Sequence, residues 1–325
     1  MSPRLFYCFT ALLALPLMTA MQNTASAEDS QAANVCPALN TTELMHDVTV
    51  LASDEFAGRE PATRGHEKAR QYITKRFAEV PLSAFQSTFI HPFEYGSSGR
   101  GTNIIGYAKG TQYSSRYIVI TAHYDHLGYK GGHIYNGADD NASGVAAMLA
   151  LAQQLALTPP LHSVIFIATD AEEEGLHGAH AFFRDLPVAS SAIALNINID
   201  MVGQGGNRDR LLLIHDGIHS YLKKPLTRLK DTVSSSHLRL GLRNARSQHS
   251  ALTRSNRENW QQASDYAVFG EKGIPFIHIG SATHNDYHQP TDTVGNIDTG
   301  FFTQSAGIAH CVFRALDKAL PAHSS

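Results

Sequence analysis

Residues that bind metals or carry protons stand at the ends of several strands predicted from the sequence. Three apolar runs lead into such residues: Tyr117–Ala122 into His123 and Asp125, Val164–Ala168 into Asp170 and Glu172-Glu173-Glu174, and Ala192–Ile199 into Asp200. A further strand predicted at 275–279 precedes His284, Asp286 and His288. Ligands of a doubly wound sheet bind beyond the carboxyl ends of its strands, so we expect these side chains to meet there.

Taken one at a time, these residues indicate little. An Asp at a strand end is commonly a turn or helix-cap residue, and a run of Glu commonly begins a solvated helix. Their occurrence at successive strand ends along one edge of a sheet favours a shared site instead. Two imidazoles with several carboxylates form the ligand set of a hydrolytic zinc site, and a bridge between two ions would explain an Asp between the His and the Glu.

The rest of the chain predicts an α/β fold with a doubly wound, mostly parallel sheet covered by helices on both faces. Apolar strands without polar alternation, separated by helices, are typical of a sheet buried on both sides. We expect a helix beginning at Thr41, helices over 66–80, 142–157, 179–186, 218–229 and 299–320, and further strands at 85–91, 102–107 and 211–215. Residues 53–59 and 241–262 are predicted to be loops.

Charge and composition exclude several other classes of protein. The chain has 26 Lys+Arg and 29 Asp+Glu among 325 residues, a formal net charge of −3, and therefore lacks the basic excess of a nucleic-acid-binding domain. With 43% apolar and 17% charged residues it has neither a disordered nor a collagen-like composition. The 18 histidines are the outlier, and they favour metal binding or proton transfer.

The amino terminus carries the pattern of a secretory signal peptide. A basic start is followed by an apolar run, Leu5–Met18, that is too short for a membrane span, and then by Ala25-Ser26-Ala27. We expect residues 1–27 to be removed, residues 28–325 to form a single domain, and the product to be periplasmic or secreted. In an oxidising compartment Cys36 and Cys311 would form either a disulfide or two buried thiols.

Five sequence motifs within residues 117–295 carry a family resemblance: Ala122-His123-Tyr124-Asp125, Gly137-Ala138-Asp139-Asp140-Asn141-Ala142-Ser143-Gly144, Glu172-Glu173-Glu174-Gly175-Leu176, Asn198-Ile199-Asp200-Met201, and His288 ahead of Pro290-Thr291-Asp292-Thr293. In this order and spacing they resemble the bacterial co-catalytic di-zinc aminopeptidases, whose relatives include glutamate carboxypeptidase and glutaminyl cyclase. Residues 51–59 and the helix over 66–80 are similar to the start of that family. The resemblance implies a zinc-dependent exopeptidase fold for residues 28–325.

The resemblance also implies two zinc ions per chain and the residues that bind each ion. His123 and Asp200 would hold one ion, Glu173 and His288 would hold the other, and Asp140 would bridge both.

Three further residues receive catalytic roles from the same resemblance. Glu172 would be the general base, Asp125 would bond the far nitrogen of the His123 imidazole, and Tyr287 would stabilise the oxyanion. The peptide bond after Asp140 would be cis. The implied reaction is hydrolysis of the N-terminal peptide bond by an exported metallo-aminopeptidase, with a zinc-bridged water as nucleophile. We expect a peptide substrate, no nucleic acid, no membrane contact after signal removal, and a monomer.

Three alternatives stay open. A glutaminyl cyclase, which is an acyltransferase, would bind one zinc ion, whereas Glu172-Glu173 and the loop around Asp140 favour two. A non-catalytic binding domain would have lost ligands, whereas each matching ligand is present here. A carboxypeptidase acting on acidic residues would need basic side chains near the site, and the following could supply them: Arg243, Arg246, Arg254 and Arg257.

Overall fold

The computed structural model describes residues 36, 39–206, 209–233, 238–245 and 263–322. The predicted signal peptide and its cleavage site lie outside these residues. Within the described ranges, no helix is both long enough and apolar enough to cross a membrane.

Helices and strands alternate along most of the chain. The α-helices are α2 (Thr41–Leu51), α3 (Arg64–Glu79), α4 (Gly144–Leu157), α5 (His177–Arg184), α6 (Ser220–Val233), α7 (Tyr266–Glu271) and α8 (Thr299–Ala319). The strands are β1 (Ser83–Ala84), β2 (Ile90–Tyr95), β3 (Gly99–Ala108), β4 (Tyr113–His123), β5 (Gly128–Lys130), β6 (His133–Tyr135), β7 (His162–Thr169), β8 (Ile193–Ile199), β9 (Arg210–Asp216), β10 (Arg239–Asn244) and β11 (Phe276–Ser281). Short helical turns are η1 (Asp54–Arg59), η2 (Ala138–Ser143), η3 (Ser190–Ala192) and η6 (Val294–Asn296).

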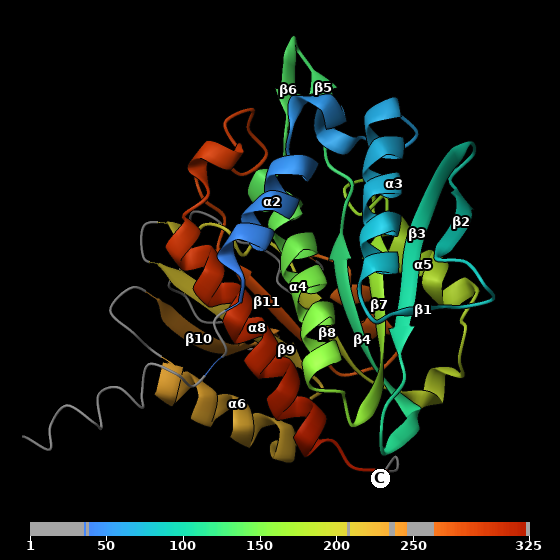
Figure 1. Cartoon of the computed structure of the whole chain (residues 1–325), viewed down its shortest axis with the longest axis vertical. Coiled ribbons are helices and arrows are strands. Elements are labelled where there is room, and N and C mark those ends of the chain that lie inside the picture. The colour runs from blue at the N-terminus through green and yellow to red at the C-terminus, as the bar shows by residue number, and fades with distance from the viewer. Residues whose placement is uncertain (1–35, 37–38, 207–208, 234–237, 246–262, 323–325) are drawn as a thin grey trace, which may run out of the picture.

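Most of the strands form one mixed sheet in the order β1-β3-β7-β4-β8-β11-β9-β10, with β2 paired to β3 (Figure 1). The four central strands, β7, β4, β8 and β11, run parallel to one another, as the doubly wound prediction requires. Towards the edges the sheet is mixed, because β3 runs antiparallel to β7 and β9 runs antiparallel to β11. The strands β5 and β6 form a separate hairpin.

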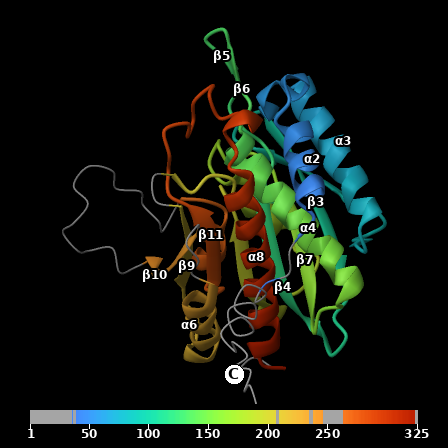
Figure 2. The same ribbon diagram turned by 60° about the vertical axis from the view of Figure 1, so that its left-hand side comes forward.

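Helices cover both faces of the sheet. The core of one face is formed with α2, α3, α4, α6 and α8, and that of the other with α5 and α7. Successive residues of β4 alternate between them: Ile118 and Ile120 pack in the first core, and Val119 packs with Phe182 and Phe269 in the second. Because both faces are buried, the strand reads as an unbroken apolar run. Figure 2 shows α2, α3, α4 and α8 together on one side of the sheet.

Side-chain caps set the starts of helices in the larger core. Asn40 accepts the backbone N–H of Thr42 at 3.1 Å at the start of α2, and Asp298 accepts that of Phe301 at 2.9 Å at the start of α8. Each cap satisfies a donor that has no partner within the helix, which fixes where the helix begins.

Three local predictions were wrong. The strand predicted at 85–91 is a turn that leads into β2, because Gln86 and Ser87 adopt left-handed backbone angles and the N–H of Thr88 bonds back to Phe85 at 3.0 Å. The predicted loop at 53–59 contains the 3-10 turn η1. The first part of the loop predicted at 241–262 belongs to β10, which extends the sheet beside β9. Residues 246–262 lie outside the described part of the chain.

Cys36 and Cys311 form a disulfide, which settles the choice left open by the sequence. Their Cα atoms lie 5.6 Å apart across a sequence separation of 275 residues. The bond ties the segment before α2 to the last helix, α8. In the loop-entropy model a closure of this length stabilises the fold by roughly 5 kcal/mol, although measured bridges mostly give about 2–4 kcal/mol.

Candidate active site

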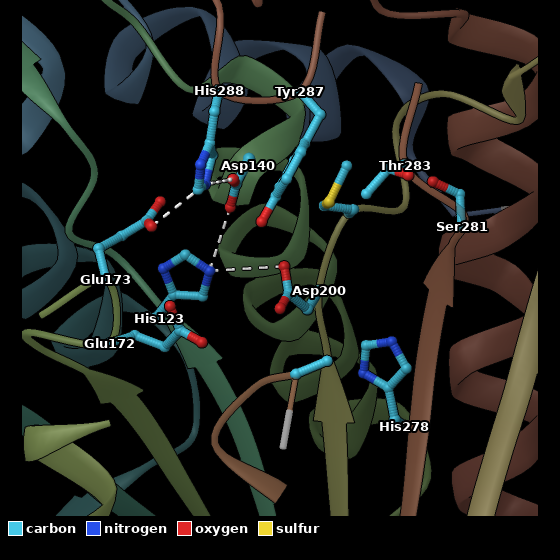
Figure 3. Close-up of a pocket in the computed structure, with 12 residues that line it drawn as sticks. His123, Asp140, Glu172, Glu173, Asp200, His278, Ser281, Thr283, Tyr287 and His288 are labelled. Atoms are coloured by element: carbon cyan, nitrogen blue, oxygen red, sulfur yellow. Dashed lines mark ion pairs between the residues drawn. The ribbon is translucent and has the colours of Figure 1, made fainter. Parts of the chain in front are cut away.

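The five predicted ligands, Glu172 and Tyr287 meet beyond the carboxyl ends of the central strands and line one pocket (Figure 3), whereas Asp125 is not among its lining residues. Strand β4 ends in His123, the turn after β7 supplies two glutamates, and β8 is followed by Asp200. The full lining is His123, Asp140, Glu172, Glu173, Asp200, Met201, Ala263, His278, Ser281, Thr283, Tyr287 and His288.

Two groups of metal-competent atoms share the carboxylate of Asp140. Nε2 of His123 lies 3.3 Å from Oδ1 of Asp140 and 3.4 Å from Oδ1 of Asp200; we call these three residues the His123 centre. Nε2 of His288 lies 3.2 Å from Oδ2 of Asp140 and 3.1 Å from Oε2 of Glu173; we call these three the His288 centre. The structure therefore brings together the five residues predicted as ligands, with Asp140 between the two centres.

The spacing of these atoms fits zinc. Two ligands that bind a tetrahedral zinc ion at about 2.0–2.1 Å lie about 3.3 Å apart. The four nitrogen–oxygen distances above, 3.1–3.4 Å, agree with that separation. Two sets of ligand atoms also lie within 4.8 Å of one another: those of His123, Glu172 and Asp200, and those of His126, Asp140 and Glu173. Imidazole nitrogens and carboxylate oxygens are the donors of catalytic zinc sites, so each centre has the chemistry to hold one ion.

The side chains that line the pocket carry more negative than positive charge. Burial would lower the pKa of both imidazoles, but the carboxylates of Glu172 and Asp200 raise the pKa of His123 well above its usual value, and hydrogen bonds with Asp140 and Glu173 raise that of His288 to about 10. Burial would raise the pKa of Asp140, yet hydrogen bonds with both imidazoles hold it well below the usual range. Divalent cations would neutralise the same excess of carboxylates.

Glu172 lines the pocket but belongs to neither the His123 centre nor the His288 centre. Burial raises the pKa of its carboxyl group well above the usual value, and Glu173 and Asp200 add to the rise against the opposing charge of His123. A carboxylate with raised proton affinity, half-buried in a pocket, is suited to accept a proton.

Asp125 joins the turn after β7 to the end of β4. Its carboxylate accepts the backbone N–H of Glu172 at 3.1 Å and that of Glu173 at 3.3 Å. The predicted contact with Nδ1 of His123 is longer, 3.7 Å from Oδ1, and the backbone oxygen of Asp125 lies nearer, at 3.2 Å. The residue therefore orients the glutamates by hydrogen bonds and His123 mainly through its main chain.

Tyr287 covers the opposite side of the pocket. Its ring stacks on that of His288 with centroids 3.9 Å apart, and its hydroxyl points towards the space between Asp140 and Asp200 (Figure 3). The wall beyond Asp200 is mixed in character. It contains the following residues: Met201, Ala263, His278, Ser281 and Thr283.

The loop that carries Asp140 is held by hydrogen bonds to both its backbone N–H groups and its backbone carbonyls. Asp292 accepts the N–H of Asp139 at 2.9 Å and that of Asp140 at 3.0 Å. The guanidinium of Arg59 donates to the carbonyl of Gly137 at 2.9 Å and to that of Tyr124, next to His123, at 2.8 Å. The peptide bond between residues 140 and 141 is cis, as predicted.

Other polar residues marked by the sequence lie outside both centres. Asp170 accepts hydrogen bonds from the ring of His66 at 2.7 Å and the N–H of Thr102 at 2.6 Å, and so fastens α3 and β3 to β7. His284 pairs with the buried carboxylate of Asp139 at 2.9 Å, and Asp286 accepts from the hydroxyl of Thr291 at 2.6 Å. These contacts are structural supports of the loops around the pocket.

Comparison with known proteins identifies the family. Residues 103–312, more than half of the chain, match the family described as Peptidase family M28. The chain belongs to peptidase family M28. This confirms the family expected from the five motifs.

Curated relatives of this M28 chain carry related names. A "Probable zinc metalloprotease" of Pyrenophora tritici-repentis is 37% identical over 113 residues, which cover 33% of this chain and 26% of the relative. Aminopeptidase YwaD of Bacillus subtilis is 28% identical over 227 residues, which cover 66% of this chain and 45% of that protein. The chain spans between 24% and 60% of the length of the first curated relatives it matches.

Solved structures share the fold of this M28 chain. The LapA aminopeptidase of Legionella pneumophila superposes with a TM-score of 0.66 at 19% identity, covering 90% of this chain and 75% of LapA. The glutaminyl cyclase of Porphyromonas gingivalis gives 0.63 at 18% identity, covering 87% of this chain and 99% of the cyclase. At such identities the likeness shows the fold alone, and it does not separate a hydrolase from a cyclase.

Proposed function

We propose that this M28 protein is a two-zinc aminopeptidase that hydrolyses the peptide bond after the N-terminal residue of its substrate. The observation that carries the proposal is the pair of centres sharing Asp140, with Glu172 beside them in the same pocket. His123 and Asp200 would hold one ion, and Glu173 and His288 the other. Zinc bound there supplies an acidified water and an electrophile for the scissile carbonyl.

The protein's own groups then handle protons and developing charge. Glu172 takes a proton from the attacking water and returns it to the leaving amine. Asp125 keeps Glu172 and its neighbour Glu173 in fixed positions through their backbone N–H groups. The hydroxyl of Tyr287 is placed to donate a hydrogen bond to the carbonyl oxygen as negative charge develops on it.

The lining of the pocket favours the amino end of a peptide over the carboxyl end. Two zinc ions would offset the charge of the carboxylates, so the two ends differ in whether the protein supplies a cation to pair with a C-terminal carboxylate. No Lys or Arg is found among the described residues that line it. Of the arginines that could serve a carboxypeptidase, Arg243 is part of β10, and Arg246, Arg254 and Arg257 lie outside the described residues.

The proposal is tested with zinc-loaded protein and a panel of aminoacyl anilides and short peptides. We expect release of the N-terminal residue when the α-amine is free and no release after N-acetylation, with about two zinc ions per chain by elemental analysis. Release of a C-terminal residue from N-acetylated peptides would establish a carboxypeptidase. Pyroglutamate formation from N-terminal Gln peptides without hydrolysis would establish a cyclase.

We further propose that the protein acts outside the cytoplasm. The signal-like residues 1–27 and the disulfide between Cys36 and Cys311 support this, because such bonds persist in oxidising compartments. Mass spectrometry of protein recovered from the periplasm or medium should show a chain that begins near Glu28 and no thiol that alkylates without reductant. An intact Met1, or two alkylated thiols in native protein, would contradict the proposal.

A further inference from the structure

A buried histidine that the motif comparison leaves without a role stands against the His288 centre. His126 follows β4 by three residues and has a side chain that is fully buried. Its Nδ1 lies 2.9 Å from Oε1 of Glu173 and 3.8 Å from Oδ2 of Asp140. Its ring meets that of His288 edge to face with centroids 5.8 Å apart.

The contact between His126 and Glu173 has the length of a hydrogen bond. A distance of 2.9 Å is the usual length of an N–H···O bond. The ligand atoms of His126, Asp140 and Glu173 lie within 4.8 Å of one another, a spacing that also allows metal binding. However, the 3.8 Å between Nδ1 of His126 and Asp140 is longer than the separation of about 3.3 Å between two ligands of one tetrahedral zinc ion. The two oxygens of Glu173 are therefore divided, with Oε1 facing His126 and Oε2 facing His288 at 3.1 Å.

The ring is held in place by the backbone around it. The N–H of His126 donates to the carbonyl of Arg59 at 3.3 Å. Gly137 has a left-handed φ of 59°, and a Cβ there would come within 2.6 Å of the His126 ring. Nε2 of His126 is buried and has no hydrogen-bond partner in the described part of the chain, so Glu173 is the polar group to which this ring is directed.

We infer that His126 is a positioning residue for the metal centre: its Nδ1–H holds Oε1 of Glu173 so that Oε2 is presented to the ion of the His288 centre. The inference rests on the two-zinc site of the proposed function. A hydrogen-bonded ligand carboxylate cannot rotate away from its ion, and removing such a partner commonly lowers metal affinity by about 10–100-fold. The effect should fall on one centre, because the His123 centre does not include Glu173.

The test compares His126→Phe, which keeps the ring shape, with His126→Asn, whose side-chain nitrogen can occupy the place of Nδ1. Zinc affinity and stoichiometry are measured by chelator competition on the full chain, and unfolding by urea is followed on metal-free protein. A matched control is His162→Phe. His162 is buried and contacts the carboxylate of Asp317 through Nδ1 at 3.0 Å in the same way, but it stands at the opposite end of β7.

We expect His126→Phe to weaken one of the two zinc ions by about 10–100-fold and to leave the other unchanged. His126→Asn should recover most of that loss. His162→Phe should lower the unfolding midpoint without changing either zinc affinity. A purely structural role for His126 would instead give the pattern of His162→Phe, with altered unfolding and unaltered zinc binding.

Other results overturn the inference or the proposed function separately. Unchanged affinities in His126→Phe overturn the inference. Complete loss of one ion at saturating zinc, without recovery in His126→Asn, shows that His126 is itself a ligand and also overturns it. A wild-type chain that binds one zinc ion contradicts the two-zinc function. The inference about His126 then stands if His126→Phe lowers the affinity for that ion and fails if the affinity is unchanged.

Discussion

Glu172→Gln is expected to lower the turnover of an aminoacyl anilide by about 10²–10⁴-fold while both zinc ions stay bound. Gln keeps the shape of the side chain but cannot accept a proton from water. Glu172 belongs to neither the His123 centre nor the His288 centre, so the five predicted ligands keep their own charges and contacts in this variant. Turnover and zinc per chain would be measured on the same preparation.

The two neighbouring glutamates provide matched controls with different expected results. Glu173→Gln removes a ligand charge from the His288 centre, so zinc content should fall towards one ion per chain together with activity. Glu174 is exposed and accepts a hydrogen bond from Tyr95, which places it away from both centres. Glu174→Gln should therefore leave zinc and turnover nearly unchanged. If Glu174→Gln is the variant that loses zinc, the assignment of the triplet is shifted by one residue.

The triplet itself shows what local pattern could and could not predict. A run of glutamates commonly begins a helix, but these three lie in a turn in which the carbonyl of Glu172 accepts the N–H of Gly175 and Leu176, and α5 begins only at His177. Their position beyond β7 was predictable, because an apolar run ends immediately before them. The backbone of the first two glutamates is held by Asp125, which lies just after β4 and is distant from them in sequence.

The central sheet was predictable for the same reason. Strands such as β4 and β7 are buried on both faces, so their apolar runs stand out without any knowledge of their neighbours. The antiparallel edges were not predictable, because the direction of β3 or β9 depends on connections and on pairing across the sheet rather than on local composition. The short hairpin β5–β6 is mostly polar and carries no such signal.

The supports of the site were harder to recognise than its ligands. His126 and Arg59 make their decisive contacts with groups that are distant in sequence, at residues 173 and 124–140. The partners of Arg59 are backbone carbonyls, and these exist at each position of the chain whatever the side chain. Such contacts leave no pattern of residue types in the sequence. The pair Gly58-Arg59 could therefore be recognised only because residues 51–59 are similar to the start of the family.

Arg59→Met is expected to lower the free energy of unfolding by about 3–5 kcal/mol, because it removes a buried cation and leaves several buried carbonyls without a donor. The guanidinium is fully buried. It donates to the carbonyls of Leu51 and Tyr124 at 2.8 Å and to that of Gly137 at 2.9 Å. Burial lowers the pKa of Arg59 to about 10 against the pull of Asp292 and Asp140, so the side chain stays charged at neutral pH.

The same change should weaken zinc binding, because Arg59 bonds the residue after His123 and a residue of the loop that carries Asp140. Urea unfolding of metal-free protein isolates the effect on the fold, and chelator competition measures the effect on the site.

Arg70→Met is the control: Arg70 pairs with Glu67 on the surface of α3, and losing such a pair costs about 0–1 kcal/mol. Arg59→Lys should fall between them, since one ammonium group cannot reach carbonyls on three separate segments. Equal stability of the Arg59→Met and Arg70→Met proteins would show that the carbonyls find other donors and that Arg59 is not the clamp of the two ligand-bearing loops.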